Sequence, residues 1–276
     1  MIELTQASLY ERHADGRPRV PTELLIKLQA LTAEDVWEVL HSAGYLNQFE
    51  GDWTIIHPET RLIGRAVTAQ FMPLRPDMKD ILHRTLNGST YIDRPNQQII
   101  DMLKSGDVVV VDLFGKREGG TFVGDLLAGA ICATTGTGMV VNGAIRDLEG
   151  VSQYKMTSYI RAVHPTPLHQ VMLTGINVPI RIGRATVLPG DVVFGDREGL
   201  YFIPPMLVQK TIETAAQNRV KEEWIKLQFQ SGRHLSRDVY PSPRTPALIE
   251  DFERFRRCKQ MGSVSQNLPD SNKVDE

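Results

Sequence analysis

The sequence predicts an α/β fold built around a parallel pair of strands. Residues 107–114 (DVVVVDLF) are a short run dominated by β-branched residues, which is typical of a strand buried on both faces. After a Gly-rich turn, residues 124–136 (GDLLAGAICATTG) are predicted to form a helix of small residues that ends at Gly136. Residues 138–144 (GMVVNGA) are a second buried strand. A strand, a helix and a strand at this spacing form a βαβ unit with a right-handed crossover.

The elements before this unit are predicted from capping residues and apolar spacing. The first twenty residues are polar and are interpreted as an arm. Thr32 is an N-cap with Asp35 three residues later, a variant capping box that leads into a helix with apolar residues at helical spacing. Residues 61–73 (RLIGRAVTAQFMP) are predicted to be a strand, and residues 78–86 a short helix.

Turn signals divide the chain after the βαβ unit. Residues 178–204 are expected to be short strands separated by turns at 189–191 (PGD) and 196–199 (DREG). Residues 205–233 are predicted to form one long helix. From Gly262 onward the Ser/Asn/Asp-rich composition predicts a disordered tail. The predicted organisation is an arm at 1–31, a main domain at 32–233 and a partly disordered C-terminal extension at 234–276.

Composition excludes several classes of protein. The formal net charge of -2 and the isoelectric point near 6.4 argue against a nucleic-acid binder, which normally carries a basic excess. Two cysteines, Cys132 and Cys258, are too few for a disulfide scaffold or a Cys-rich zinc module. No apolar stretch approaches the roughly 18–20 residues that a membrane span needs, and the charged N-terminus lacks an apolar signal core. We therefore expect a cytoplasmic protein without a membrane partner.

Chemistry-bearing residues gather at one end of the βαβ unit. Asp125 opens the helix after Gly124, and Arg146 and Asp147 follow the second strand. The amides at a helix N-terminus favour an anion, Arg146 can hold a carboxylate, and Asp147 can bind a hard divalent cation that keeps several waters. This pattern favours a site for a keto acid. The alternative is structural: Asp125 caps the helix, and Arg146 and Asp147 form a surface turn.

Other polar residues carry less weight as site candidates. His164 and His169 are five residues apart, which does not place them on one helix face as metal ligands. Cys132 lies in an apolar helix and is expected to be a buried small hydrophobic residue rather than a nucleophile. Three aspartates are expected to shape turns or strand ends: Asp112, Asp191 and Asp196.

The motifs resemble the RraA-like family. The resemblance covers about residues 32–233 and is carried by VVVVD, GDLLA, GMVVNGAIRDLEG, VPIRIG and VLPGDVVFGDREGLYFIP. It implies an α-β-β-α sandwich that assembles into trimeric or hexameric rings with sites between subunits. The family includes the 4-hydroxy-4-methyl-2-oxoglutarate/4-carboxy-4-hydroxy-2-oxoadipate aldolases.

The resemblance also implies roles for individual residues. It places the metal ligand at Asp147, the substrate-carboxylate arginine at Arg146 and an acidic residue near the metal's water shell at Asp125. The amides that hold the substrate fall on Leu126 and Leu127, beside Gly124. A glutamate from the neighbouring subunit falls on Glu222, with Glu223 as a rival because the helix register is not fixed by the sequence.

The function implied is that of a Mg²⁺- or Mn²⁺-dependent lyase. It would cleave a 4-hydroxy-2-oxo diacid to release pyruvate, with oxaloacetate decarboxylation as a side activity. Asp125 acting through a water, or Glu222, would accept the C4 hydroxyl proton. The alternative is a non-catalytic RraA-like regulator that binds RNase E or helicase partners. The presence of Asp125, Arg146 and Asp147 together favours the enzyme, which would be a homotrimer or homohexamer with a 2-oxo acid substrate.

Overall fold

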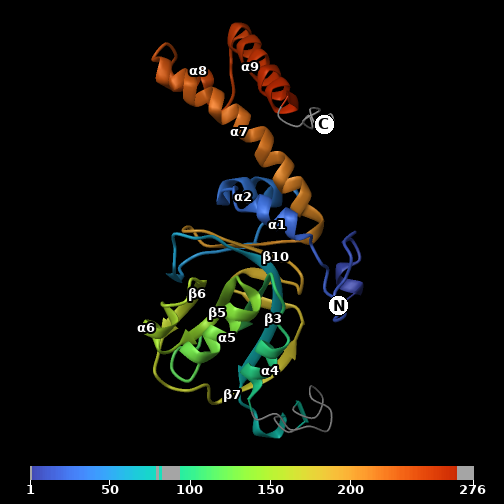
Figure 1. Cartoon of the computed structure of the whole chain (residues 1–276), viewed down its shortest axis with the longest axis vertical. Helices are drawn as coiled ribbons and strands as arrows, with labels where there is room; N and C mark the ends of the chain where they lie inside the picture. The colour runs from blue at the N-terminus through green and yellow to red at the C-terminus, as the bar shows by residue number, and fades with distance from the viewer. Residues whose placement is uncertain (1, 79–80, 83–93, 266–276) are drawn as a thin grey trace, which may run out of the picture. The chain divides into compact units, whose positions relative to one another are not determined.

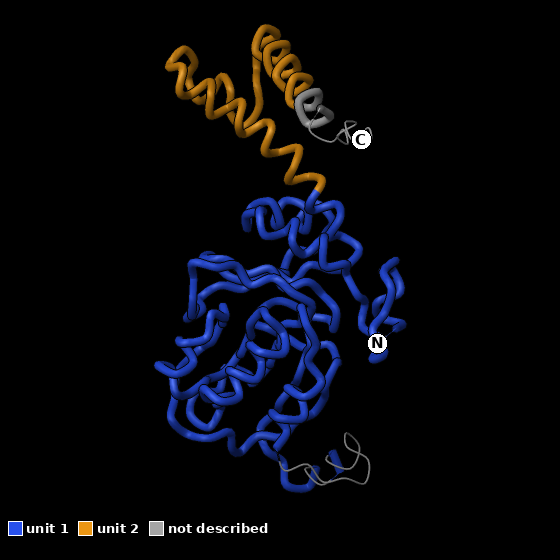
Figure 2. The backbone as a smooth tube through the Cα atoms, in the orientation of Figure 1, with its two compact units in different colours: residues 1–212 blue, residues 213–276 orange. Residues whose placement is uncertain are grey.

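The computed structural model describes residues 2–78, 81–82 and 94–265, and for residues 260–265 it describes the backbone only. The chain divides into two compact units, residues 1–212 and 213–276 (Figure 2). Within the described residues, no helix is both long enough and apolar enough to cross a membrane.

The first unit is built on a large curled sheet with the strand order β1-β11-β10-β3-β4-β5-β6-β2, to which β7 adds by pairing with β3. The neighbours from β3 to β6 are parallel, and the other pairs are antiparallel. The strands are β1 Phe49–Glu50, β2 Thr54–Ile56, β3 Leu62–Pro73, β4 Asp107–Asp112, β5 Gly138–Ile145, β6 Thr157–Val163, β7 Val171–Ile176, β10 Val192–Gly195 and β11 Leu200–Ile203. A separate hairpin joins β8 (Ile180–Ile182) to β9 (Ala185–Val187).

The helices of this unit form two outer layers. Helices α4 (Pro95–Asp101) and α5 (Asp125–Thr135) lie against one side of the parallel strands (Figure 1). Helix α2 (Ala33–Ser42) contacts β11, and α1 (Thr22–Leu28) contacts β3. The short elements are η1 Glu3–Thr5, α6 Leu148–Val151 and η2 Pro205–Leu207. The sheet curls so that β10 and β11, together with the β8–β9 hairpin, pack across a shared core from the parallel strands. With helices outside both strand layers, this is the predicted α-β-β-α sandwich.

The valine run of β4 shows why the predicted strand had to be buried on both faces. Val109 and Val111 pack into the core that holds α4 and α5. Val108 and Val110 pack into the opposite core, which contains residues of β8–β11. Because successive side chains of a strand point to opposite faces, every valine of the run is covered.

The predicted capping box is present at the start of α2. The Thr32 hydroxyl accepts a hydrogen bond from the Asp35 amide at 3.3 Å, and the Asp35 carboxylate accepts one from the Thr32 amide at 2.8 Å. The helix predicted over 124–136 is also confirmed as α5, which ends at Gly136 in a left-handed conformation with φ 66°. Of the helix predicted over 78–86, residues 79–80 and 83–86 lie outside the described residues.

The polar N-terminal segment is anchored to the sheet by a buried ion pair. The Arg17 guanidinium donates to both Asp107 carboxylate oxygens, at 3.0 and 3.1 Å, and both side chains are fully buried. Asp15 adds a second carboxylate 2.8 Å from Arg17 Nε. The segment therefore reaches the first residue of β4 although its composition is that of an arm.

The second unit consists of helices around a small core of its own. It contains most of α7 (Val208–Ser231), which is the predicted long helix, followed by α8 (Ser236–Val239) and α9 (Pro246–Ser265). Trp224 is buried against Val239 and Leu248, and its indole N–H donates to Asp251 at 2.9 Å. Helix α9 continues past Gly262, where a disordered tail was predicted to begin, because a helix anchored by packed turns propagates at one hydrogen bond per residue. Residues 266–276 lie outside the described residues.

Candidate active site

The predicted site residues of the first unit meet at the carboxyl-terminal edge of the parallel strands. Gly124 is the N-cap of α5, and Arg146 and Asp147 follow β5 directly. A hydrogen bond from the Arg146 amide to the Val123 carbonyl, 3.0 Å, holds the two segments side by side. The structure thus brings together residues that are 22 positions apart in the sequence.

Gly124 is needed because the Asp147 side chain occupies the space beside it. A Cβ at residue 124 would lie 2.5 Å from Asp147 Oδ2 and 3.1 Å from Arg146 Nε. Real Cβ atoms do not approach other atoms so closely, so any larger residue would displace the aspartate. Gly150 plays a similar part for Asp125, whose Cβ would be 2.7 Å from a Cβ at residue 150. Glycines therefore create the room in which both carboxylates sit.

Asp147 has a left-handed backbone, with φ 55° and ψ 47°, at the N-terminus of α6. This region is uncommon for residues other than glycine, although aspartate tolerates it better than most. Backbone strain of this kind costs about 1–3 kcal/mol and clusters at functional sites. The conformation places the Asp147 carboxylate beside Gly124 at the start of α5.

The charges of the site lie at the surface. Arg146 Nε is 3.3 Å from Asp147 Oδ2, and both side chains are about half exposed. Asp125 Oδ1 accepts a hydrogen bond from the Leu126 amide at 2.8 Å. One of the two amides predicted to hold a substrate carboxylate is therefore occupied by the aspartate that precedes it, so a bound anion would displace that carboxylate.

The donor set fits a hard divalent cation. Asp147 lies beside Gly124 and Asp125 beside Gly150, and a cation such as Mg²⁺ needs only one or two protein carboxylates because it keeps several waters. Among the described residues no cluster of three or more His, Cys, Asp or Glu side chains forms a complete protein cage. An open site of this kind leaves positions for water and substrate.

The two candidate glutamates belong to the second unit. Glu222 is within 3.6 Å of Lys226 one turn later, and its carboxylate is half exposed. Glu223 instead pairs with Lys259 of α9. Of the two glutamates, Glu223 forms a salt bridge between α7 and α9, whereas Glu222 pairs with Lys226 within α7. The role of Glu222 at the site of a neighbouring subunit stays a prediction.

The other residues considered from the sequence take part in packing or in local hydrogen bonds. His169 lies against Gly119, and His164 bonds to Thr166. Cys132 is partly buried against the core around α5. All three aspartates predicted to shape turns accept backbone amide hydrogen bonds: Asp112 from Phe114, Asp191 from Leu188, and Asp196 from Glu198.

A cavity next to the site was missed by the sequence reasoning. It has a volume of about 470 Å³ and is lined by residues that include Leu127, Arg94, Asn96 and His169. These residues come from separate segments of the chain, so no local sequence motif predicts the cavity. Arg94 is the charged side chain that could have drawn attention to it.

Comparison with known proteins identifies the family. A family model described as "RraA-like: Aldolase/RraA" matches residues 33–201. The chain belongs to the RraA-like family. The matched region contains Gly124, Asp125, Arg146 and Asp147 and ends before Glu222.

Several relatives of known sequence resemble this RraA-like protein over part of their length. DlpA of Legionella pneumophila is 27% identical over 216 residues, which are 77% of this chain and 32% of DlpA. A Halalkalibacterium halodurans protein named "Putative 4-hydroxy-4-methyl-2-oxoglutarate aldolase" is 29% identical over 50% of this chain and 67% of its own. A protein of the same name from Ectopseudomonas mendocina is 31% identical over 39% of this chain and 66% of its own. The chain thus spans about a third of DlpA and about two thirds of these aldolase-named relatives.

Solved structures share the fold. RraAS2 of Streptomyces coelicolor, described as an unusual member of the RNase ES inhibitor RraA family, superposes with a TM-score of 0.65 at 25% identity, over 76% of this chain and 98% of that protein. An uncharacterised protein from Pseudomonas syringae has a TM-score of 0.64 at 21% identity and covers 91% of this chain and all of its own. The second likeness concerns the fold alone.

Proposed function

We propose that this RraA-like protein is a divalent-metal-dependent carbon–carbon lyase that cleaves a 4-hydroxy-2-oxo diacid and releases pyruvate. The observation that carries the proposal is the convergence of Asp125, Arg146 and Asp147 around Gly124 at the N-terminus of α5. The aldolase names of two relatives support the same reaction class.

The positive groups of the site are suited to a substrate carboxylate. The Arg146 guanidinium is half exposed and is held by Asp147 through one nitrogen, so its other nitrogens are available to a carboxylate. The first-turn amides of α5 have no partners within the helix, which makes its N-terminus attractive to an anion. Together they would hold the C1 carboxylate and fix the adjacent 2-oxo group.

A divalent ion, Mg²⁺ or Mn²⁺, held by Asp147 with Asp125 near its water shell, would polarise the 2-oxo oxygen. Asp125, through a water, or Glu222 of a neighbouring subunit would take the C4 hydroxyl proton. The C4 oxygen then forms a carbonyl as the C3–C4 bond breaks, and its electron pair passes toward the 2-oxo group. Protonation at C3 completes pyruvate. The same electron flow, with carbon dioxide leaving, decarboxylates oxaloacetate.

The cavity beside Leu127 would accept the distal part of the diacid. Arg94 supplies a positive charge to it, while Asn96 is held in place by donating to the Phe122 carbonyl at 2.9 Å. A second carboxylate on the substrate therefore has a cationic side chain available on the same side of α5. This arrangement favours diacids over monoacids.

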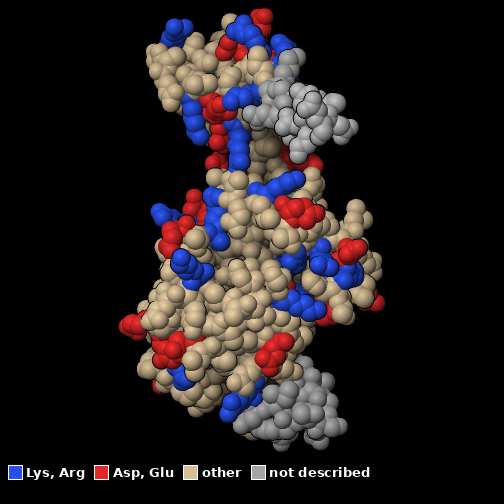
Figure 3. Space-filling model, in the orientation of Figure 1, with Lys and Arg blue, Asp and Glu red and all other residues tan. Residues whose placement is uncertain are grey.

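Assembly into a homotrimer or homohexamer is part of the proposal. Leu126, at the start of α5, exposes 80% of its side chain although it is strongly apolar. Lys, Arg, Asp and Glu side chains are sparse on the face of the first unit that carries α5 (Figure 3). A partner subunit seated there would cover Leu126 and could bring its own Glu222 to the site.

The deciding experiment is an assay of pyruvate release from a series of 4-hydroxy-2-oxo diacids and from oxaloacetate, with Mg²⁺, Mn²⁺ or EDTA. We expect release that depends on the metal and is faster for diacids than for a matched 4-hydroxy-2-oxo monoacid. Arg94→Gln should reduce kcat/KM for the diacid and leave that for the monoacid unchanged. Absence of release from every substrate with either metal would reject the lyase, and release unaffected by EDTA would reject the metal.

A further inference from the structure

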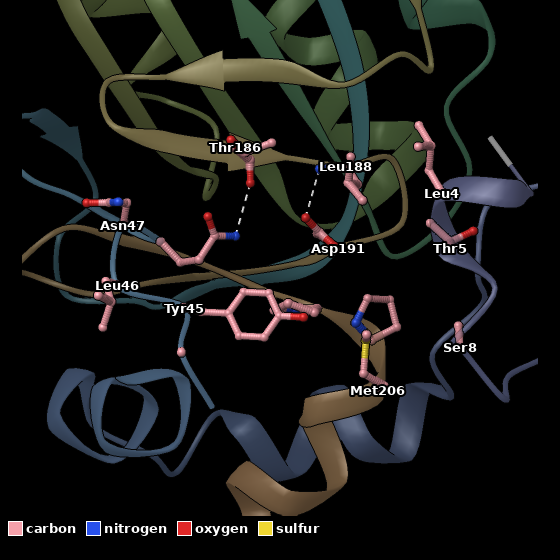
Figure 4. A pocket seen from close by; sticks show the side chains of 14 residues that line it. Leu4, Thr5, Ser8, Tyr45, Leu46, Asn47, Thr186, Leu188, Asp191 and Met206 are labelled. Atoms are coloured by element: carbon pink, nitrogen blue, oxygen red, sulfur yellow. Dashed lines mark hydrogen bonds between the residues drawn. The ribbon is translucent and has the colours of Figure 1, made fainter. Parts of the chain in front are cut away.

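A second cavity of the first unit lies at the end of the sheet where the parallel strands begin, and Figure 4 shows it from close by. It is bordered by the turn that leads into β10, where the Asp191 carbonyl accepts a hydrogen bond from the Ala66 amide. Ala66 pairs with Val108 near the beginning of β4, whereas the candidate site follows the carboxyl ends of the same strands. The cavity has a volume of about 380 Å³, at the small end of the range for ligand pockets, about 300–1,000 Å³.

A buried carboxyl group forms part of the cavity wall. Asp191 is only 3% exposed, and its Oδ2 accepts a hydrogen bond from the Leu188 amide at 2.8 Å. Burial raises the pKa of Asp191 to about 7, with no charged neighbour contributing to that rise. The group is thus a buried carboxyl without a counter-charge in the wall of the cavity.

Neutral polar side chains share the cavity with Asp191, among them Gln48, Ser8 and Asn47. Gln48 donates through its Nε2 to the carbonyls of Thr186 and Phe202, at 3.0 and 3.1 Å, so both of its amide hydrogens are used and Oε1 remains as an acceptor. The Ser8 hydroxyl is buried and has no hydrogen-bond partner among the described residues. No Lys, Arg or His is found among the described residues that line the cavity.

The rest of the wall is apolar. Tyr45 and Met206 both line the cavity, and Leu188 lies beside Asp191 (Figure 4). An aromatic ring can contact the apolar body of a ligand and also attracts a cation placed over its face.

We propose that this cavity binds a small organic monocation, namely a primary ammonium group on a compact apolar body. An ammonium offers three donors and no acceptor, which suits the Asp191 carboxylate, the Gln48 Oε1 atom and the Ser8 hydroxyl of the lining. Its charge neutralises Asp191, which otherwise remains desolvated and unpaired. An anion such as a 2-oxo diacid would be buried against a carboxylate with no positive group nearby. The site is therefore distinct from the proposed active site and does not depend on its assignment.

The test is isothermal titration of the full chain at pH 8 in phosphate buffer with three ligands of nearly equal shape: benzylamine, benzyl alcohol and benzoate. We expect benzylamine to bind at least tenfold more tightly than benzyl alcohol, and benzoate not to bind. Asp191→Asn keeps an oxygen that accepts the Leu188 hydrogen bond but removes the charge, so it should weaken benzylamine binding at least tenfold. Asp196→Asn removes a partly exposed turn carboxylate outside the cavity and should leave binding unchanged.

A second measurement locates the ligand without altering Asp191. With [¹³C-methyl]methionine labelling, benzylamine should shift the methyl resonance of Met206, assigned by its loss in Met206→Leu, and leave that of the core residue Met139 in place. Equal affinity for benzylamine and benzyl alcohol, tight binding of benzoate, or full benzylamine affinity in Asp191→Asn would overturn the proposal. So would benzylamine binding that leaves the Met206 resonance unmoved.

Discussion

Removal of the Asp191 charge should change how the stability of the protein depends on pH. Because burial raises the pKa of Asp191 to about 7 from an ordinary 3.8, the folded protein keeps this proton over a range where the unfolded chain has lost it. The stabilisation is fully present below pH 3.8 and is lost as pH rises through 7. At about 1.4 kcal/mol per pKa unit, the two pH units from pH 5 to pH 7 correspond to roughly 3 kcal/mol.

The assay is urea unfolding of the wild type and of Asp191→Asn at pH 5, 6, 7 and 8, followed by far-ultraviolet circular dichroism in buffers without amines. The free energy of unfolding of the wild type, relative to that of the variant, should fall by roughly 3 kcal/mol between pH 5 and pH 8, with most of the fall complete at pH 7. Asp196→Asn controls for the loss of one negative charge. A difference between wild type and Asp191→Asn that is the same at all four pH values would refute the reasoning.

Four further variants test the site and the packing. Asp147→Ala should abolish pyruvate release with the circular dichroism spectrum unchanged, and wild-type turnover in Mg²⁺ would remove Asp147 as the metal ligand. Arg146→Lys keeps the charge but loses the planar fork, so kcat/KM should fall at least tenfold, about 1.4 kcal/mol, and an unchanged value would place the carboxylate elsewhere. Asp107→Asn removes the fully buried carboxylate of the Arg17 pair and leaves only the partly exposed Asp15 beside the guanidinium, so it should lower the free energy of unfolding by about 3 kcal/mol in urea titrations, whereas a loss below about 1 kcal/mol would show that the pair is dispensable. Co-expression of Asp147→Ala with Glu222→Ala should restore activity that neither variant has alone, and its absence in verified mixed rings would remove Glu222 from the site.

Elements whose signals are local were predictable from the sequence. The capping box at Thr32 and Asp35, the left-handed glycine at 136 and the valine run of β4 each depend on a few adjacent residues. The meeting of Asp125 with Arg146 and Asp147 was predictable for a related reason. In a βαβ unit the end of the second strand and the start of the helix reach the same edge of the sheet.

Features that depend on distant contacts could not be predicted in this way. The valine run shows that both faces of β4 are covered, but not that β8–β11 cover one of them. The polar composition of the first twenty residues does not reveal that Arg17 is fully buried, because its partner Asp107 is ninety residues away. The left-handed backbone of Asp147 is likewise set by the packing of Gly124 against it rather than by a sequence signal.

The contrast between Asp125 and Asp191 shows that the hydrogen bond an aspartate makes to the backbone does not determine which ligand it can bind. Each accepts a hydrogen bond of 2.8 Å from a nearby backbone amide, and each was open to interpretation as a structural cap or turn residue. Asp125 stands at an open edge, so its bond to Leu126 can be exchanged for water, a cation or a substrate at little cost. Asp191 is buried, and no Lys, Arg or His among the described residues that line its cavity compensates its charge. A ligand for Asp191 must therefore carry the compensating charge itself, whereas a ligand at Asp125 needs only to compete with solvent.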